Sequence, residues 1–211
     1  MRTIISAMLV LGLMAFALAD DPVGEKKDIK AELKQAPSSD NPIVLMEIAH
    51  GDTVLGIAEI EIYEHELPIH GGNFLKLVDE GYYDSLTFHR VVPGFVIQGG
   101  DPTGTGTGGP PGRLQDDESS PYKHDYATIA MARSGAGASK SQFYVNLKEN
   151  YFLDPQGFLI FAKVIKGMDI FERIAGVETS GSKQSPKPVT PVIMTKVYRK
   201  QVEKKADEVK N

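Results

Sequence analysis

The sequence predicts an all-β fold, namely a closed eight-stranded antiparallel barrel capped by two α-helices. Eight short segments of the 211-residue chain have the patterning of strands, and only two isolated segments have the period of a helix. Strands and helices therefore do not alternate as they do in a parallel α/β fold. The 21 Gly and 13 Pro suit a chain with many turns. A closed barrel leaves no sticky sheet edge, and a helix at each open end would cover the core.

Regular patterning begins at Pro42 with a predicted hairpin. Its first strand, Ile43–Ile48, is almost wholly apolar, which is typical of a buried strand. Its second strand, Gly56–Tyr63, alternates glutamate with isoleucine, as a half-buried strand does. Residues 50–55 between them contain Gly-Asp, which is typical of a hairpin turn.

The period then changes from two to that of a helix. Within residues 68–80, Phe74, Leu77 and Val78 repeat at helical spacing after a proline in the first turn, and Gly81 ends the run. This pattern predicts the first helix, which would cover one end of the barrel.

The second predicted helix is Met168–Ala175. Phe171 and Ile174 share one face, acidic residues lie early in the segment, and Gly176 follows it. Six further strands are predicted, five before this helix and one after it. They are Leu86–Val92, Phe95–Gln98, Ala127–Ala132, Gln142–Leu147, Leu159–Ile165 and Val192–Tyr198.

Residues 1–19 have the organisation of a secretory signal peptide. Arg2 precedes an apolar run that ends in the small-x-small sequence Ala17-Leu18-Ala19. The run is short for a membrane span, although an uncleaved anchor or a buried helix is the alternative. We expect an exported mature protein that begins at Asp20, is periplasmic or secreted, and has no stable membrane insertion after cleavage.

The remaining chain divides into three predicted parts. Residues 20–41 form a flexible charged spacer, residues 42–198 one folded domain, and residues 199–211 a charged tail with the character of a solvated, fraying helix. We expect the protein to be a monomer.

Composition excludes several classes of function. The chain has 23 Lys and Arg against 28 Asp and Glu, and its net charge of −5 argues against a nucleic-acid partner. It has no Cys, so disulfides, thiolate zinc sites and thiol catalysis are impossible. The five His show no metal-ligand spacing, and we interpret all of them as structural or surface residues: His50, His65, His70, His89 and His124.

Seven of the 21 glycines lie within residues 99–112, which suggests a phosphate cradle at first sight. A P-loop needs Lys and Ser or Thr after its last glycine, and a dinucleotide fingerprint needs a helix there. Here Gly109 is followed by Pro110-Pro111, so the segment argues against nucleotide binding.

Arg90 is the most informative single residue, because it lies in a strand otherwise composed for packing. A surface arginine with its stem on apolar neighbours is the common alternative. Phe95, Gln98 and Gly99 follow closely, and they would surround one guanidinium with an apolar wall, an amide and close backbone. Further along, Phe143 and Phe161 are expected in the core.

From about Ile43 to Tyr198 the sequence resembles the cyclophilin family of peptidyl-prolyl cis-trans isomerases. The residues that carry the resemblance are 88–101 (FHRVVPGFVIQGGD), 106–109 (GTGG), Met131-Ala132, 141–143 (SQF) and Leu153-Asp154. The resemblance implies the barrel with two helices that the patterning predicts. It also implies rotation about X–Pro bonds in proline-containing polypeptides. Together with the predicted export, this activity would assist protein folding outside the cytoplasm. No bond is broken in that reaction, so no nucleophile, metal or cofactor is required.

Carried over residue by residue, the resemblance implies a site on the outer face of the barrel. Its catalytic group would be Arg90, supported by Gln98 and Phe95. Substrate would be contacted in the proline pocket, along its backbone and beside the residue before proline by Val96, Gly106, Ala132, Arg133, Gln142, Tyr144, Phe152, Leu153 and Phe158.

Three of these residues depart from common members of the family. Tyr144 stands in place of the usual Phe, so its hydroxyl must find a partner or water. Arg133 stands where eukaryotic members commonly have Asn, and in this respect the sequence resembles bacterial-type members. Phe152 replaces a Trp and lacks its indole N–H, which predicts weak binding of cyclosporin.

Two other functions are alternatives to an isomerase. A non-enzymatic module that binds proline-containing chains would use the same pocket. A structural envelope protein would instead depend on the charged tail at residues 199–211.

Overall fold

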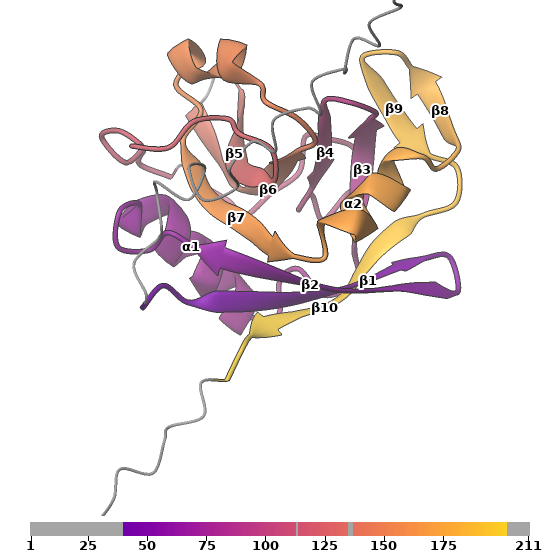
Figure 1. Cartoon of the computed structure of the whole chain (residues 1–211), viewed down its shortest axis with the longest axis horizontal. Helices are drawn as coiled ribbons and strands as arrows, with labels where there is room; N and C mark the ends of the chain where they lie inside the picture. Colours follow the sequence, from indigo (N-terminus) through magenta and orange to yellow (C-terminus); the bar gives the residue numbers. More distant parts are fainter. Residues whose placement is uncertain (1–39, 113, 135–136, 202–211) are drawn as a thin grey trace, which may run out of the picture. The chain divides into compact units, whose positions relative to one another are not determined.

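The computed structural model describes residues 40–112, 114–134 and 137–201, and these form a closed barrel of eight antiparallel strands (Figure 1). Around the barrel the order is β1, β10, β3, β4, β6, β5, β7, β2. The strands are β1 (Ile43–His50), β2 (Thr53–Ile62), β3 (Leu86–Val92), β4 (Val96–Gly99), β5 (Thr128–Ser134), β6 (Gly137–Asn146), β7 (Ile160–Lys166) and β10 (Val192–Arg199). Each of the eight predicted strands is present, and the predicted fold class is confirmed.

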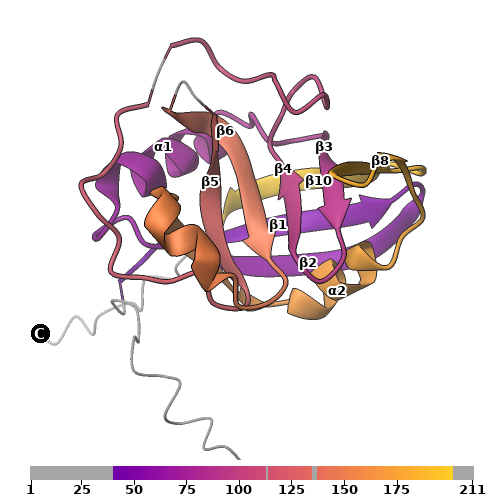
Figure 2. The same ribbon diagram turned by 90° about the horizontal axis from the view of Figure 1, so that it is seen from above.

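The two predicted helices are also present and lie on opposite sides of the barrel (Figure 2). Helix α1 (Pro68–Asp79) packs against β6, β7 and β10, and helix α2 (Met168–Ala175) packs against β2, β3 and β4. The first turn of α1 is completed from a distant loop, because the Asp117 carboxylate accepts hydrogen bonds from the backbone N–H groups of Ile69 and His70 at 3.0 and 2.9 Å.

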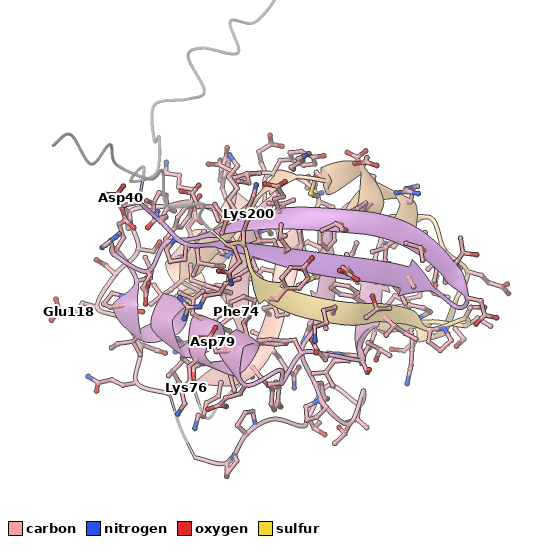
Figure 3. The ribbon with its side chains drawn as sticks, turned by 90° about the horizontal axis from the view of Figure 1, so that it is seen from below. Asp40, Phe74, Lys76, Asp79, Glu118 and Lys200 are labelled. Atoms are coloured by element: carbon pink, nitrogen blue, oxygen red, sulfur yellow. The ribbon has the colours of Figure 1, made fainter. Side chains whose placement is uncertain are left out.

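The interior of the barrel is aromatic where α1 meets it. Phe74 of α1 is buried, and its ring centroid lies 5.7 Å from that of Phe143 and 5.2 Å from that of Phe161. Phe143 and Phe161 are completely buried, as predicted. The outer side of the same helix carries Lys76 and Asp79, which are exposed (Figure 3). The helix therefore closes the core with one face and meets solvent with the other.

The barrel extends slightly beyond its predicted ends. Asn41, the last residue of the predicted spacer, is buried and donates from Nδ2 to Glu61 Oε1 at 3.3 Å. Arg199, the first residue of the predicted tail, is the last residue of β10 and forms two 2.7 Å hydrogen bonds with Asp79. The predicted signal peptide at residues 1–19, most of the spacer and the rest of the tail lie outside the described residues. Within the described residues, no helix combines the length and apolar character needed to cross a bilayer.

Three elements had no counterpart in the sequence prediction, and two strands start earlier than predicted. One of these is β2, which begins at Thr53 where Gly56 was predicted. Strands β8 (Thr179–Ser182) and β9 (Ser185–Pro188) form a separate hairpin, and Tyr151–Gln156 forms a 3-10 helix, η1. Strand β6 begins at Gly137, where Gln142 was predicted. The added strand segments are mostly polar, and they are defined by pairing with a partner strand, which local patterning does not record.

Candidate active site

A single row of side chains crosses four adjacent strands on the outer face of the barrel. Strand pairing places Arg90 opposite Gln98, Gln98 opposite Tyr144, and Tyr144 opposite Ala130. The next row along the same strands consists of core residues: Val91, Ile97, Val145 and Ile129. Because successive side chains of a strand point to opposite faces, the first row points away from the core. Strand register therefore gathers residues that are far apart in the sequence.

Arg90 is half-buried and held on three sides. Its Nε donates to the backbone carbonyl of Gln184 at 2.9 Å, and its Nη1 donates to Gln98 Oε1 at 3.4 Å. Its guanidinium carbon lies 5.9 Å from the centre of the Phe95 ring. Burial lowers the pKa of Arg90 from its ordinary value. Since that ordinary value is about 12.5 or higher, the group remains cationic at neutral pH.

The amide of Gln98 is oriented by a second glutamine. Gln98 Nε2 donates to Gln142 Oε1 at 3.0 Å, and Gln142 Nε2 in turn donates to the carbonyl of Gly108 at 2.8 Å. This sequence of bonds directs the Gln98 oxygen toward Arg90. It also connects the guanidinium to the glycine-rich segment.

An apolar cavity of about 230 Å³ lies beside Arg90. Its lining consists of Arg90, Phe95, Val96, Gln98, Ala132, Arg133, Tyr144, Leu153 and Phe158. Behind this lining is a small hydrophobic cluster, separate from the main core, that includes Tyr63, Ala130 and Ile160. The cavity therefore has a packed apolar floor and one cationic edge.

A second cavity of about 440 Å³ shares Gln98, Ala132 and Arg133 with the first, and Gly106 and Gln142 also line it. Phe152 lines neither cavity, but its ring is stacked on that of Phe95 with 5.8 Å between centroids. The structure thus brings together all of the residues that the resemblance singled out.

The glycine-rich segment folds around a carboxylate of its own. Asp101 is almost completely buried, and it accepts hydrogen bonds from the backbone N–H groups of Thr103, Thr105, Gly106 and Gly108 at 2.6 to 3.1 Å. A side chain at Gly108 would collide with this carboxylate. Burial alone would raise the pKa of Asp101, but the hydrogen bonds, led by that from Gly108, outweigh it and lower the pKa well below its ordinary value. The cradle that resembles a phosphate site therefore encloses Asp101.

Three residues close to the cavity were not predicted as parts of the site. Gln184 lies at the tip of the β8–β9 hairpin, whose polar sequence gives no strand signal. His124 and Asp154 lie behind Tyr144, and His124 Nε2 is 2.8 Å from the Tyr144 hydroxyl. The sequence signal that could have pointed to His124 and Asp154 was the Tyr144 hydroxyl, because a tyrosine in an apolar pocket needs a hydrogen-bond partner.

No cluster of three or more His, Asp or Glu side chains that could hold a metal ion occurs in the described part of the chain. Fold and site together define a class of protein: a small barrel whose outer face carries an apolar cavity beside one half-buried arginine.

Comparisons with known proteins place the chain in a family. Residues 44–199 match the family described as "Cyclophilin type peptidyl-prolyl cis-trans isomerase/CLD". The peptidyl-prolyl cis-trans isomerase ppi1 of Schizosaccharomyces pombe is 39% identical over 148 residues, which cover 68% of this chain and 93% of that protein. Peptidylprolyl isomerase domain and WD repeat-containing protein 1 of Mus musculus is 34% identical over 172 residues; the match covers 80% of this chain but only 26% of that protein.

Solved structures agree with the sequence comparison. A crystal structure of a cyclophilin type peptidyl-prolyl cis-trans isomerase from Cryptosporidium parvum has a TM-score of 0.68 and 30% identity, covering 77% of this chain and 99% of that one. A second structure of that protein, in the presence of the dipeptide Ala-Pro, has a TM-score of 0.67. The chain belongs to the cyclophilin-type peptidyl-prolyl cis-trans isomerase family, as the resemblance predicted. It is an enzyme of this type, and its substrates are proline-containing peptides.

Proposed function

We propose that this isomerase accelerates rotation about X–Pro bonds of exported polypeptides and so assists their folding outside the cytoplasm. The proposed reaction centre is Arg90, and the proposed proline site is the cavity of about 230 Å³ beside it. Gln98 and Gln142 would hold the flanking backbone of the substrate. The residue before proline would lie toward the second cavity, near Gly106.

The barrier to this reaction is the loss of amide resonance, about 18–20 kcal/mol. At the twisted geometry the prolyl nitrogen regains a lone pair, and a fixed donor aimed at it stabilises the transition state more than the planar amide. Arg90 has N–H groups beyond the two that bond Gln98 and Gln184. Those groups can serve the nitrogen or the prolyl carbonyl while the apolar cavity holds the ring.

The observation that carries this proposal is the position of Arg90 at the edge of an apolar cavity sized for a small ring, with its guanidinium held by Gln98 and Gln184. A cation that is already oriented loses little freedom when the substrate reaches its transition state. The Ala-Pro dipeptide used with the Cryptosporidium relative is of the same chemical class as the substrate proposed here.

The proposal is tested with Arg90→Ala and Arg90→Lys in an isomerase assay on a proline-containing peptide. We expect kcat/KM to fall about 10²–10³-fold in Arg90→Ala, the usual effect of removing one transition-state donor. Lys should be a poor substitute, because a point charge cannot serve two acceptors in a plane. Circular dichroism serves as the control for folding. Unchanged turnover in Arg90→Ala would remove Arg90 from the mechanism, and binding without accelerated exchange in the wild type would favour a passive peptide-binding module.

Export is supported by the charged start, apolar run and small-x-small end of residues 1–19. Mass spectrometry of protein recovered from the extracytoplasmic fraction tests it directly. We expect a mature N-terminus at Asp20, and an intact Met1 in the cytoplasmic fraction alone would contradict export.

A further inference from the structure

The lining of the proline cavity is tied to a chain of three polar side chains behind it. Asp154 Oδ1 lies 2.6 Å from His124 Nδ1, and His124 Nε2 lies 2.8 Å from the Tyr144 hydroxyl. His124 is completely buried and Tyr144 nearly so. We call these residues the Asp154–His124–Tyr144 chain.

A neutral imidazole placed between a carboxylate and a phenol leaves one direction for the two hydrogen bonds. An ionised Asp154 can only accept, so Nδ1 of His124 must carry a proton and donate it. Nε2 of a neutral imidazole then has only a lone pair, and it must accept from the Tyr144 hydroxyl. Each polar atom named here has a partner, which is the condition for burying His124 and the Tyr144 hydroxyl without a large cost; Asp154, at the end of the chain, is partly exposed.

The order Asp, His, hydroxyl is also that of a hydrolase triad. Here, however, the hydroxyl points into the protein and away from the cavity where substrate would bind. Tyr144 lines the cavity, whereas its hydroxyl bonds a completely buried imidazole. Burial, and to a lesser extent Asp154, raises the pKa of Tyr144 well above its ordinary value, so the phenol stays protonated. The chain therefore has a role in placing the ring, not in attack on the substrate.

The chain also reaches two other walls of the cavity. The Phe158 ring is edge-on to both His124 and Tyr144, with centroid distances of 6.2 and 5.8 Å. Asp154 directly follows Leu153 in the 3-10 helix η1, and its carboxylate also accepts from the backbone N–H of His124 at 3.0 Å. Fixing Asp154 and His124 thus fixes three walls at once.

We propose that His124 and Asp154 are positioning residues of the isomerase. They hold the Tyr144 ring in place and keep its hydroxyl out of the cavity, so that a tyrosine presents an apolar floor to the proline ring. Phe158 and Leu153 are held by the same pair. This inference rests on the proposed role of the cavity as the proline site.

The experiment separates this role from a general structural one by comparing kcat with KM. A floor that binds proline equally in the ground and transition states affects KM and leaves kcat nearly unchanged. Loss of one hydrogen bond corresponds to about a fivefold change. We therefore expect Tyr144→Phe to raise KM about fivefold, with kcat altered less than about twofold. Tyr82→Phe is the matched control, because its hydroxyl bonds Ser141 at 3.3 Å and lies outside the cavity lining; its KM should not change.

Two replacements of His124 test the direction of the chain. Asn places its amide nitrogen near the position of Nδ1 and cannot reach Tyr144, whereas the longer Gln places its amide near the position of Nε2. We expect His124→Asn to raise KM as Tyr144→Phe does, and His124→Gln to restore most of the wild-type KM. The double variant Tyr144→Phe with His124→Asn should be no worse than either single variant, since both break one bond.

Nitrogen NMR of the imidazole provides a readout that does not depend on activity. In the wild type the shifts should identify a proton on Nδ1 of His124, and the Nε2 signal should move in Tyr144→Phe. The inference is overturned by a proton on Nε2 in the wild-type neutral form, by unchanged KM in both Tyr144→Phe and His124→Asn, or by equal effects of Asn and Gln. Failure of the proposed function looks different: Arg90→Ala would then keep its activity whatever these variants do.

Discussion

The two sides of the candidate site are held by different physical means. The proline cavity lies on the sheet, where strand register and a packed apolar cluster place its lining. The second cavity lies between strands β5 and β6 and the segment after β4, which has no regular secondary structure between residues 100 and 112. Four backbone N–H groups of this segment donate to the carboxylate of Asp101. Gln142 and Lys187 bond two of its carbonyls from outside.

The two sides should therefore differ in how well they tolerate substitution. On the sheet side, the position of any one residue is fixed by several strands and many van der Waals contacts, so a volume-conserving substitution there has a limited effect on stability. On the loop side, four backbone N–H groups share one charged acceptor, so removing its charge weakens all four hydrogen bonds together.

Asp101→Asn should be the most damaging conservative change near the site. Its amide retains one acceptor oxygen but turns N–H donors toward the N–H donors of the loop, and charge-assisted bonds become neutral ones. We expect the free energy of unfolding to fall by about 3 kcal/mol, measured by urea denaturation. Asp52→Asn, in the exposed turn between β1 and β2, is the matched control and should change stability by less than about 0.5 kcal/mol. Equal effects of the two would show that the loop does not depend on its carboxylate.

The same residue should also account for part of the acid sensitivity of the protein. Folding lowers the pKa of Asp101, so its ionised form contributes stability above the unfolded-chain pKa of about 3.9, and that contribution is lost as the pH falls toward the folded pKa. Between about pH 5 and pH 2 the wild type should therefore lose stability more steeply than Asp101→Asn. Parallel curves for the two proteins, from urea midpoints at each pH, would contradict this assignment.

The sheet side was predictable from the sequence because its strands carry either an apolar alternation or a nearly continuous apolar run. Ile60 and Ile62 alternate with glutamates and are both completely buried, as the pattern indicated. Register between strands is a different matter. That Gln98 lies between Arg90 and Tyr144 depends on two pairings, one across 8 residues (98 − 90) and one across 46 (144 − 98). Only the resemblance to a family supplied the longer pairing beforehand.

The loop side was the harder part to predict, for a physical reason. Its glycines suggested an anion site, and the anion turned out to be Asp101, the residue that follows the first glycines of the segment. The hairpin that reaches Arg90 was missed because its strands contain no apolar alternation. His124 was interpreted as structural, since one histidine has no ligand spacing; its partners, Asp154 and Tyr144, are brought to it only by the fold.

The β8–β9 hairpin contacts both sides of the site. Substitutions in it can therefore distinguish the effect of the contact with Arg90 from that of the contact with the loop. The Gln184 carbonyl accepts from Arg90 on the sheet side, and Lys187 Nζ donates to the Gly104 carbonyl at 3.3 Å on the loop side. Replacing Lys183-Gln184 by Asn-Gly, which favours a different two-residue turn, should redirect the carbonyl away from Arg90. We expect kcat/KM to fall about fivefold, as for one lost hydrogen bond.

The controls for this exchange keep the backbone and remove only side chains. Lys183→Ala and Gln184→Ala leave the carbonyl in place, so their kcat/KM should stay within about twofold of the wild type. Lys187→Met breaks only the exposed bond to the loop and should have an equally small effect. A loss in Gln184→Ala as large as in the turn exchange would assign the effect to the side chain and not to the carbonyl.

The smallest effect is expected where the two sides are joined by an ion pair at the surface. Arg133 Nη1 lies 2.5 Å from Asp116 Oδ2 and 3.1 Å from the Gly157 carbonyl, and both charged side chains are partly exposed. Solvent screens such a pair, and the carbonyl would still hold the guanidinium after Asp116→Asn. We expect stability to change by less than about 1 kcal/mol and kcat/KM by less than about twofold, with the difference shrinking further in 0.5 M salt. A loss as large as that of Asp101→Asn would mean that the loop side depends on this surface pair as much as on its buried carboxylate, and the contrast drawn above would then be wrong.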